Sequence, residues 1–412
     1  MTRRLSGLLA ALAIAVVAFA GNAKPAKALA PPRLTVTGAS LIDADTGQQL
    51  YGVDATRRLP IASTTKLMTA LVTLQHVHHL GTVFAQNDWT AAPADSQIGL
   101  VPGERMSVHD LLLALMLPSA DDAAEDLAYN VGGRSVPRFV AMMNAEARAL
   151  HLRDTHYSTP IGLDTPGNYS SPEDLDRLAA YAIAHSAFFR RIVSLPSAVL
   201  RTGRYRRTVT NRNDLVIRFP WIDGVKTGHT LQAGYVLVVS GRRNGMRLIG
   251  SVLGTSSIPA RDANALALLD YGFAAFHVVE PVRAGQRLAR VSVDGADRRP
   301  FAVVAATLKR VVARDDRVRV EVRLTRHLVA PLPRHAVVGH AVVLSGGRPI
   351  GSVALVLPRA VSAVSSMTRV IRFLDQPFTL LVVLLAAGLA FALGGTRRRR
   401  QMPMQRGQVE ER

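Results

Sequence analysis

The first residues that could do chemistry together are Ser63 and Lys66, in the segment I-A-S-T-T-K-L-M-T-A. The apolar spacing that follows predicts a helix from Ser63 to about Leu80. Residues i and i+3 lie on one face of a helix, so the amine can reach the hydroxyl. The chain has 45 arginines and only five lysines, so a lysine at this position indicates a function that arginine cannot perform.

General-base catalysis is a function that a lysine at position 66 can perform and an arginine cannot. A serine hydroxyl is a weak nucleophile until a neighbouring base removes its proton. Burial and nearby cations shift lysine toward its neutral form, whereas arginine stays protonated. The helix N-terminus adds a free backbone N–H and partial positive charge where an oxyanion would form. Alone, the pair is better explained as an N-cap serine beside a surface lysine.

Two further motifs favour the catalytic interpretation. Ser119-Ala120-Asp121 follows Pro118, at a predicted break between two helices. Lys226-Thr227-Gly228 lies on a predicted strand. A helix N-cap would explain Ser119 and an exposed strand position would explain Lys226. The ordered set of three motifs is not explained in that way, so we predict an active site.

The elements that carry these motifs indicate an α+β domain with an antiparallel sheet. Alternation around Asp-Thr-Gly predicts a β-hairpin at residues 34–53, and Asn244-Gly245 between two apolar runs predicts a second one. Helical spacing and serine-led starts predict helices between the hairpins and a closing helix, within residues 106–131, 135–150, 170–186 and 258–276.

The sequence changes in character after Val278. The segment R-V-R-V-E-V-R-L at residues 317–324 alternates strictly, and glycine and proline separate short apolar runs. We predict a small all-β domain at residues 278–358, acting as a stalk or docking module, and a juxtamembrane linker at residues 359–375.

Both ends of the chain resemble targeting segments. Residues 1–30 have a basic start, an apolar middle and the exit Ala28-Leu29-Ala30, which is typical of a secretory signal peptide. Residues 376–396 carry no charge over 21 residues, enough for a transmembrane helix across a bilayer core of about 30 Å. The arginines that open the basic tail at residues 397–412 predict a cytoplasmic C-terminus, so we expect a single-pass membrane protein whose residues 31–370 lie outside.

The composition fits an exported protein. The net charge of +20 is partly in the two end segments and otherwise spread along the chain, which favours an anionic membrane face or cell-wall polymer over nucleic acid. The chain has no cysteine, so its stability must come from its core without disulfides.

In this order, S-x-x-K, S-x-N-like and K-T-G motifs resemble those of the penicillin-recognising serine enzymes. The closer resemblance is to the low-molecular-mass penicillin-binding proteins, serine-type D-alanyl-D-alanine carboxypeptidases. It covers about residues 34–358 and includes R-R-L-P-I-A-S-T-T-K, Y-S-S-P-E-D-L and I-D-G-V-K-T-G-H-T. It implies a β-lactamase/transpeptidase-like domain at residues 31–277, followed by the small β domain and a membrane attachment.

The resemblance also implies roles for individual residues. The catalytic residues would be Ser63 as acylated nucleophile, Lys66 as general base and Ser119 as proton relay. The backbone N–H groups of Ser63 and His229 would form the oxyanion hole. The substrate-binding residues would be Asp121, Lys226, Thr227, Gly228, His229 and Arg261, of which the lysine, Thr227 and the arginine would hold the terminal carboxylate.

The implied reaction is removal of the terminal D-Ala from a peptidoglycan pentapeptide stem, and β-lactams would acylate the same serine. We expect neither a metal nor a cofactor. A D,D-endopeptidase on cross-links would use the same residues, a β-lactamase would need fast deacylation, and a peptidoglycan-binding protein without turnover stays an alternative.

The second motif departs from the family at Asp121, where an asparagine is usual. A carboxylate keeps the contact with the base lysine but has no N–H to donate to the substrate. It would also favour the protonated form of Lys66. We therefore expect altered or weakened turnover.

Overall fold

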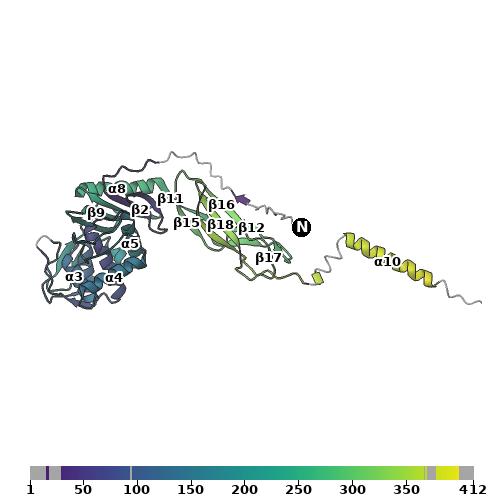
Figure 1. The fold of residues 1–412 in the computed structure, drawn as a ribbon, viewed down its shortest axis with the longest axis horizontal. Helices are drawn as coiled ribbons and strands as arrows, with labels where there is room; N and C mark the ends of the chain where they lie inside the picture. The colour runs from purple at the N-terminus through teal and green to yellow at the C-terminus, as the bar shows by residue number, and fades with distance from the viewer. Residues whose placement is uncertain (1–14, 18–28, 93–94, 366, 369–376, 399–412) are drawn as a thin grey trace, which may run out of the picture.

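The computed structural model describes residues 15–17, 29–92, 95–365, 367–368 and 377–398 (Figure 1). Most of the predicted signal peptide, part of the predicted linker and most of the basic tail lie outside these residues. The described residues form a helix-rich domain, a β domain and a separate C-terminal helix.

An antiparallel sheet is the centre of the first domain. Within the described residues its strand order is β3-β2-β10-β9-β8. Both predicted hairpins are confirmed, and the second turns at Asn244-Gly245, where both residues have positive φ (52° and 74°), as a tight turn between twisted strands requires. The strands are β2 (Gly38–Asp43), β3 (Gln49–Val53), β8 (Ile222–Thr230), β9 (Gly234–Arg243) and β10 (Met246–Thr255).

Helices cover both faces of this sheet (Figure 1). Leu237 and Val239 of β9 pack in one apolar cluster with α8 (Ile258–Ala275), whereas Val236 and Val238 pack in another with α5 (Pro172–His185). Successive side chains of a strand point to opposite faces, so a strand buried on both sides needs a continuous apolar run. This explains the unbroken segment Y-V-L-V-V of β9.

In the first domain, each helix that has a side-chain N-cap is capped by a serine. Each capping side chain accepts a hydrogen bond from the backbone N–H of the residue three positions later, which satisfies a donor that the helix leaves unpaired. The capping residues are Ser107, Ser135, Ser171, Ser186 and Ser257. The remaining helices are η1 (Ala62–Thr65), α1 (Lys66–His76), α2 (Val108–Met116), α3 (Asp121–Val131), α4 (Val136–Ala149), α6 (Ala187–Ile192) and α7 (Leu215–Arg218).

The first motif helix is shorter than predicted. It ends at His76 because Val77 is extended, with φ −117° and ψ 98°, so the prediction of a helix to about Leu80 is wrong at that end. The chain then enters a small strand pair. Short pairs beside the helices are formed by β4 (Val83–Ala85) with β5 (Arg105–Ser107), and by β6 (Ser197–Leu200) with β7 (Arg207–Thr210).

The β domain follows α8 and has its own apolar core. Val320 and Val322 are buried while Arg319 and Arg323 are exposed, which confirms the alternation seen in the sequence. An isolated bridge between Ala296 and Ala363 carries the β structure past residue 358. Its strands are β11 (Phe276–Val282), β12 (Arg287–Arg290), β13 (Val293–Asp294), β14 (Phe301–Val304), β15 (Leu308–Ala313), β16 (Val318–Leu324), β17 (Leu328–Val329), β18 (Val337–Ser345) and β19 (Arg348–Val356), with β1 (Ala15–Val17) paired to β16.

The C-terminal helix α10 (Pro377–Arg398) coincides with the predicted transmembrane segment, apart from Gln376, which is not described. Among the described residues, however, a search for helices of sufficient length and apolarity to cross a membrane finds none. The transmembrane helix is therefore not confirmed and stays a prediction.

Candidate active site

The predicted contact between Ser63 and Lys66 is present. Ser63 lies partly exposed in η1, and Lys66 is the fully buried first residue of α1. The Lys66 Nζ donates to Ser63 Oγ at 2.8 Å and to the carbonyl oxygen of Ile161 at 2.7 Å. The amine is thus held against the hydroxyl that it would deprotonate.

A glycine makes this contact between distant segments possible. Gly162 has φ +91°, and a Cβ there would lie 2.1 Å from the carbonyl oxygen of Ala62. Only glycine lets the backbone beside Ile161 approach η1 this closely. That approach brings the Ile161 carbonyl to the buried amine.

A second lysine and serine form a matching pair. Ser119 lies between α2 and α3 with φ 68°, and its Oγ accepts a hydrogen bond from Lys226 Nζ at 2.8 Å. Lys226 is buried on β8 and also donates to the carbonyl oxygen of Thr227 at 3.0 Å. The helix break and the strand that the sequence predicted therefore meet in one place.

The strand β8 closes the site against Ser63. A Cβ on Gly228 would lie 2.9 Å from both the Ser63 nitrogen and the Ala62 Cβ, so the K-T-G glycine permits direct backbone contact. The next residue, His229, is exposed, and its ring centroid lies 4.0 Å from that of Tyr235. In this way Gly228 lies against the Ser63 nitrogen, and His229 follows it on β8.

Asp121 contacts Lys66, as expected for this position. Its Oδ1 lies 2.5 Å from Lys66 Nζ, and both side chains are buried. Burial nevertheless lowers the pKa of Lys66 below its ordinary value, and the charge of Arg212 acts in the same direction, while Asp121 raises it. The carboxylate therefore opposes the neutral form of Lys66 without outweighing the burial of the amine.

The pKa of the second lysine, Lys226, is lowered more strongly than that of Lys66. Burial, followed by the charges of Lys66 and Arg212, holds the pKa of Lys226 well below its ordinary value. Such a cation is costly without an anionic partner. A substrate carboxylate would supply that partner.

Sequence reasoning missed Arg212, whose charge acts on both lysines. Its Nη1 donates to Ser96 Oγ at 2.7 Å, and its backbone nitrogen donates to the Leu117 carbonyl at 3.1 Å. The segment N-R-N was the available signal. Asparagines often bind nearby backbone groups, and here the Nδ2 atoms of Asn211 and Asn213 bind the carbonyls of Val193 and Gly224.

Arg261, expected to help hold the carboxylate, is buried on α8. Its guanidinium lies 2.7 Å from Asp262 and 3.6 Å from Asp214. Its charge still contributes to the lowered pKa of Lys226. In this structure it therefore lends positive potential to the site while its own ion-pair contacts go to acids of the α7–α8 region.

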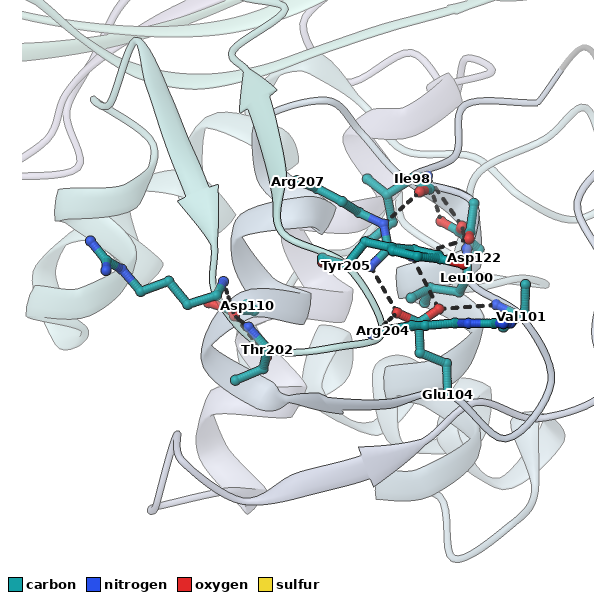
Figure 2. A network of polar contacts seen from close by, with 12 residues as sticks. Ile98, Leu100, Val101, Glu104, Asp110, Asp122, Thr202, Arg204, Tyr205 and Arg207 are labelled. Carbon is teal, nitrogen blue, oxygen red and sulfur yellow. Dashed lines mark hydrogen bonds and ion pairs between the residues drawn. The ribbon is translucent and has the colours of Figure 1, made fainter.

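Buried carboxylates fix the loop at residues 98–104 (Figure 2). Asp122 accepts the backbone N–H groups of Ile98 at 3.1 Å and Leu100 at 3.0 Å. Glu104 accepts two hydrogen bonds from Arg207, at 2.7 and 3.1 Å. Just before this loop, the Ser96 carbonyl accepts the Asp121 N–H at 2.6 Å, so these contacts hold the start of α3 in place.

Glu125 adds a further carboxyl behind the site. It lies one helical turn after Asp121 on α3 and is buried. Burial, followed by the charge of Asp121, raises the pKa of Glu125 to about 7, against an ordinary value of 4.5, while Lys66 acts in the opposite direction. The protonated carboxyl is therefore favoured in the folded chain.

The chain matches the family described as D-alanyl-D-alanine carboxypeptidase over residues 25–257. The D-alanyl-D-alanine carboxypeptidase DacA of Haemophilus influenzae is 30% identical over 358 residues, covering 82% of this chain and 88% of the relative. A D-alanyl-D-alanine carboxypeptidase of Streptomyces sp. strain K15 is 36% identical, covering 61% of this chain and 92% of the relative. The crystal structure of penicillin-binding protein 5 from Haemophilus influenzae matches with TM-score 0.71 and 30% identity, covering 81% of this chain and 99% of that one.

We expect Glu125→Gln to stabilise the fold at pH 8 and to have little effect at pH 4. Because the folded chain releases this proton only near pH 7, stability present below the unfolded value is lost as pH rises through that range. The neutral amide avoids this loss, which is on the order of 3 kcal/mol. Urea unfolding at both pH values measures it.

The partly exposed Glu146 of α4 offers a matched control, Glu146→Gln. An equal stability difference between Glu125→Gln and the native chain at the two pH values would contradict the expectation.

Proposed function

This chain belongs to the D-alanyl-D-alanine carboxypeptidase family, and on that premise we propose that it removes the terminal D-Ala from peptidoglycan pentapeptide stems through an acyl-enzyme on Ser63. The observation that carries the assignment of residues is the contact of 2.8 Å between the buried amine of Lys66 and the Ser63 hydroxyl. The chain is accordingly a hydrolase, and β-lactams would acylate the same hydroxyl.

Acylation begins with a proton transfer. The neutral form of Lys66, favoured by burial, accepts the Ser63 proton while Oγ attacks the carbonyl carbon of the penultimate D-Ala. The backbone N–H groups of Ser63 and His229 would stabilise the oxyanion. The C–N bond then breaks, and Ser119, whose Oγ accepts a hydrogen bond from Lys226 Nζ, would relay the proton from Lys66 to the amine of the departing D-Ala.

Binding of a free C-terminus follows from the second lysine. The cation of Lys226 and the hydroxyl of Thr227 would bind the terminal carboxylate, and the positive potential of Arg212 and Arg261 would strengthen this contact. An internal peptide bond offers no such anion. After D-Ala leaves, a water molecule deprotonated by Lys66 would attack the ester and release the shortened stem.

Ser63→Ala should abolish both labelling by fluorescent penicillin and D-Ala release from a pentapeptide, because the acyl group has no oxygen to occupy. Ser197→Ala, which changes a serine on β6, is the matched control and should label like the native chain. Mass analysis of the pentapeptide measures the loss of one D-Ala. Labelling that survives in Ser63→Ala would refute the assignment.

Asp121→Asn should move the acidic limb of the acylation rate to lower pH, because the carboxylate raises the pKa of Lys66 and the amide does not. The neutral fraction of the amine at a given acidic pH then rises, and acylation becomes faster. The measurement is the second-order rate of penicillin acylation between pH 5 and 9. A limb that stays in place, or a slower rate throughout, would show that the carboxylate is no handicap.

We also propose that the enzyme works outside the cytoplasmic membrane, exported by the signal peptide and attached through α10. The uncharged segment of 21 residues and the four arginines after it support this proposal. So do the apolar side chains of Leu384, Leu385 and Phe391, which are 63%, 65% and 87% exposed on α10. The β domain would then act as a stalk between the membrane and the first domain.

Truncation tests the attachment. The full chain should sediment with membranes and resist carbonate extraction, whereas a chain ending at Ser365 should be released in soluble form. Both should keep penicillin labelling, which reports the first domain. Equal distribution of the two chains would contradict the proposed anchor.

A further inference from the structure

A buried threonine on α1 makes a contact that the reaction described above does not use. Thr69 lies one helical turn after Lys66, and both side chains are fully buried. Its Oγ1 donates a hydrogen bond to the carbonyl oxygen of Pro160 at 2.7 Å. The next carbonyl along the chain, that of Ile161, accepts from Lys66 Nζ, also at 2.7 Å. Two successive carbonyl groups are therefore held by two side chains of the same helix.

These carbonyl groups belong to the segment at residues 157–168. The residues on either side of it, His156 and Tyr169, meet in an isolated β-bridge. Further along the segment, the exposed Asp164 accepts a hydrogen bond from Thr230 Oγ1 of β8 at 2.6 Å. The segment therefore contacts β8 as well as α1, so its position matters to both elements that carry a lysine of the site.

The hydrogen bond of Thr69 differs from that of the next threonine on the helix. A threonine hydroxyl inside a helix can donate to the backbone carbonyl four residues earlier. Thr73, which is also fully buried, does this: its Oγ1 donates to the carbonyl oxygen of Thr69 at 2.8 Å. The Thr69 hydroxyl instead binds a carbonyl group that is 91 residues away in the sequence. Its hydrogen bond thus joins α1 to the segment that carries Ile161.

The carbonyl group of Pro160 depends on this hydroxyl. Among the residues that the structure describes, no backbone N–H donates to the Pro160 carbonyl, and its hydrogen bond comes from Thr69. A buried carbonyl without a partner costs free energy, so removal of the hydroxyl would let this peptide group turn toward another donor. Because Ile161 is the next residue, its carbonyl would turn as well, and the hydrogen bond from Lys66 would weaken.

The Ile161 carbonyl matters because it determines where the hydrogens of the Lys66 amine point. As an ammonium group, the amine has three N–H donors, and its three neighbours are Ser63 Oγ, the Ile161 carbonyl and Asp121 Oδ1. After the loss of one proton it has two N–H groups and a lone pair. A carbonyl oxygen and an ionised carboxylate have no hydrogen to donate, so these two neighbours keep the N–H groups. The lone pair is left for the Ser63 hydroxyl.

We propose that Thr69 is a positioning residue, which directs the lone pair of Lys66 toward the Ser63 hydroxyl. It acts through the carbonyl groups of Pro160 and Ile161. The inference rests on the proposed function, because it takes Lys66 as the base that accepts the serine proton. Without the Thr69 hydroxyl, the amine can turn an N–H toward Ser63 instead, and an amine in that orientation cannot accept the proton.

The test compares variants that keep or lack the hydroxyl. The full chain in detergent is assayed for the second-order rate of penicillin acylation between pH 5 and 9. In Thr69→Val and Thr69→Ala the maximum rate should fall about tenfold, which corresponds to one hydrogen bond, whereas Thr69→Ser should stay within about twofold of the native rate. Thr73→Val is the matched control, because it removes a buried hydroxyl whose hydrogen bond lies within α1, and it should acylate at close to the native rate.

The pH dependence separates positioning from a general loss of folded protein. A carbonyl acceptor binds the ammonium form of an amine more strongly than the neutral form, so its loss lowers the pKa of Lys66. The acidic limb of the rate should therefore move to lower pH in Thr69→Val, although the maximum rate falls. A loss of folded protein would lower the rate equally at every pH. The charged groups that interact with Lys66 are unchanged in these variants, and they are Asp95, Asp121, Glu125, Arg212 and Lys226.

Several results would overturn the inference while the native chain is still labelled by penicillin. One is a rate in Thr69→Val that equals the rate in Thr73→Val, or a rate that falls while the acidic limb stays in place. Another is a Thr69→Ser chain as slow as Thr69→Ala. If urea unfolding showed that neither hydroxyl-free variant folds, the hydroxyl would serve the fold and the inference would also be wrong. A native chain that penicillin does not label would instead overturn the proposed function.

Discussion

The burial of one amine beside one hydroxyl is the constraint on which the rest of the site depends. Lys66 has no exposed surface, and its nitrogen contacts Ser63, Asp121 and the Ile161 carbonyl. An ammonium group in such surroundings loses hydration that these contacts must replace. Burial lowers the pKa of Lys66 and so favours the neutral amine that can accept a proton, whereas a solvated lysine at its ordinary pKa stays charged near neutral pH.

The other charges of the site act on this balance from opposite sides. Burial and the charge of Arg212 favour a neutral Lys66, and Asp121 favours a charged one. The charge of Asp121 also acts on Glu125 one turn later, where burial and this charge raise the pKa of the second carboxyl. A cluster of this kind explains how the chain can carry an acid where an amide is usual without fixing its base lysine as a cation.

Local chemistry made part of this site predictable from sequence. The one-turn spacing of Ser63 and Lys66, the break at Pro118 and the Asn244-Gly245 turn each follow from a few adjacent residues. The partners that complete the site do not, because they come from far along the chain. Ile161 is 95 residues from Lys66, and Ser96 is 116 residues from Arg212. Such contacts depend on how whole helices and strands pack together, and a short sequence motif does not predict that packing.

Burial also decreases from Lys226 to Asp164, and this changes how much a polar contact is worth at each residue. At one end Lys226 is buried, so a charge-assisted contact there is worth about 1.5–3 kcal/mol. At the other end Asp164 is exposed, and an ion pair there is worth about 0.2–1 kcal/mol. A contact between a terminal carboxylate and Lys226 would therefore contribute more to binding than a contact between a peptide side chain and Asp164.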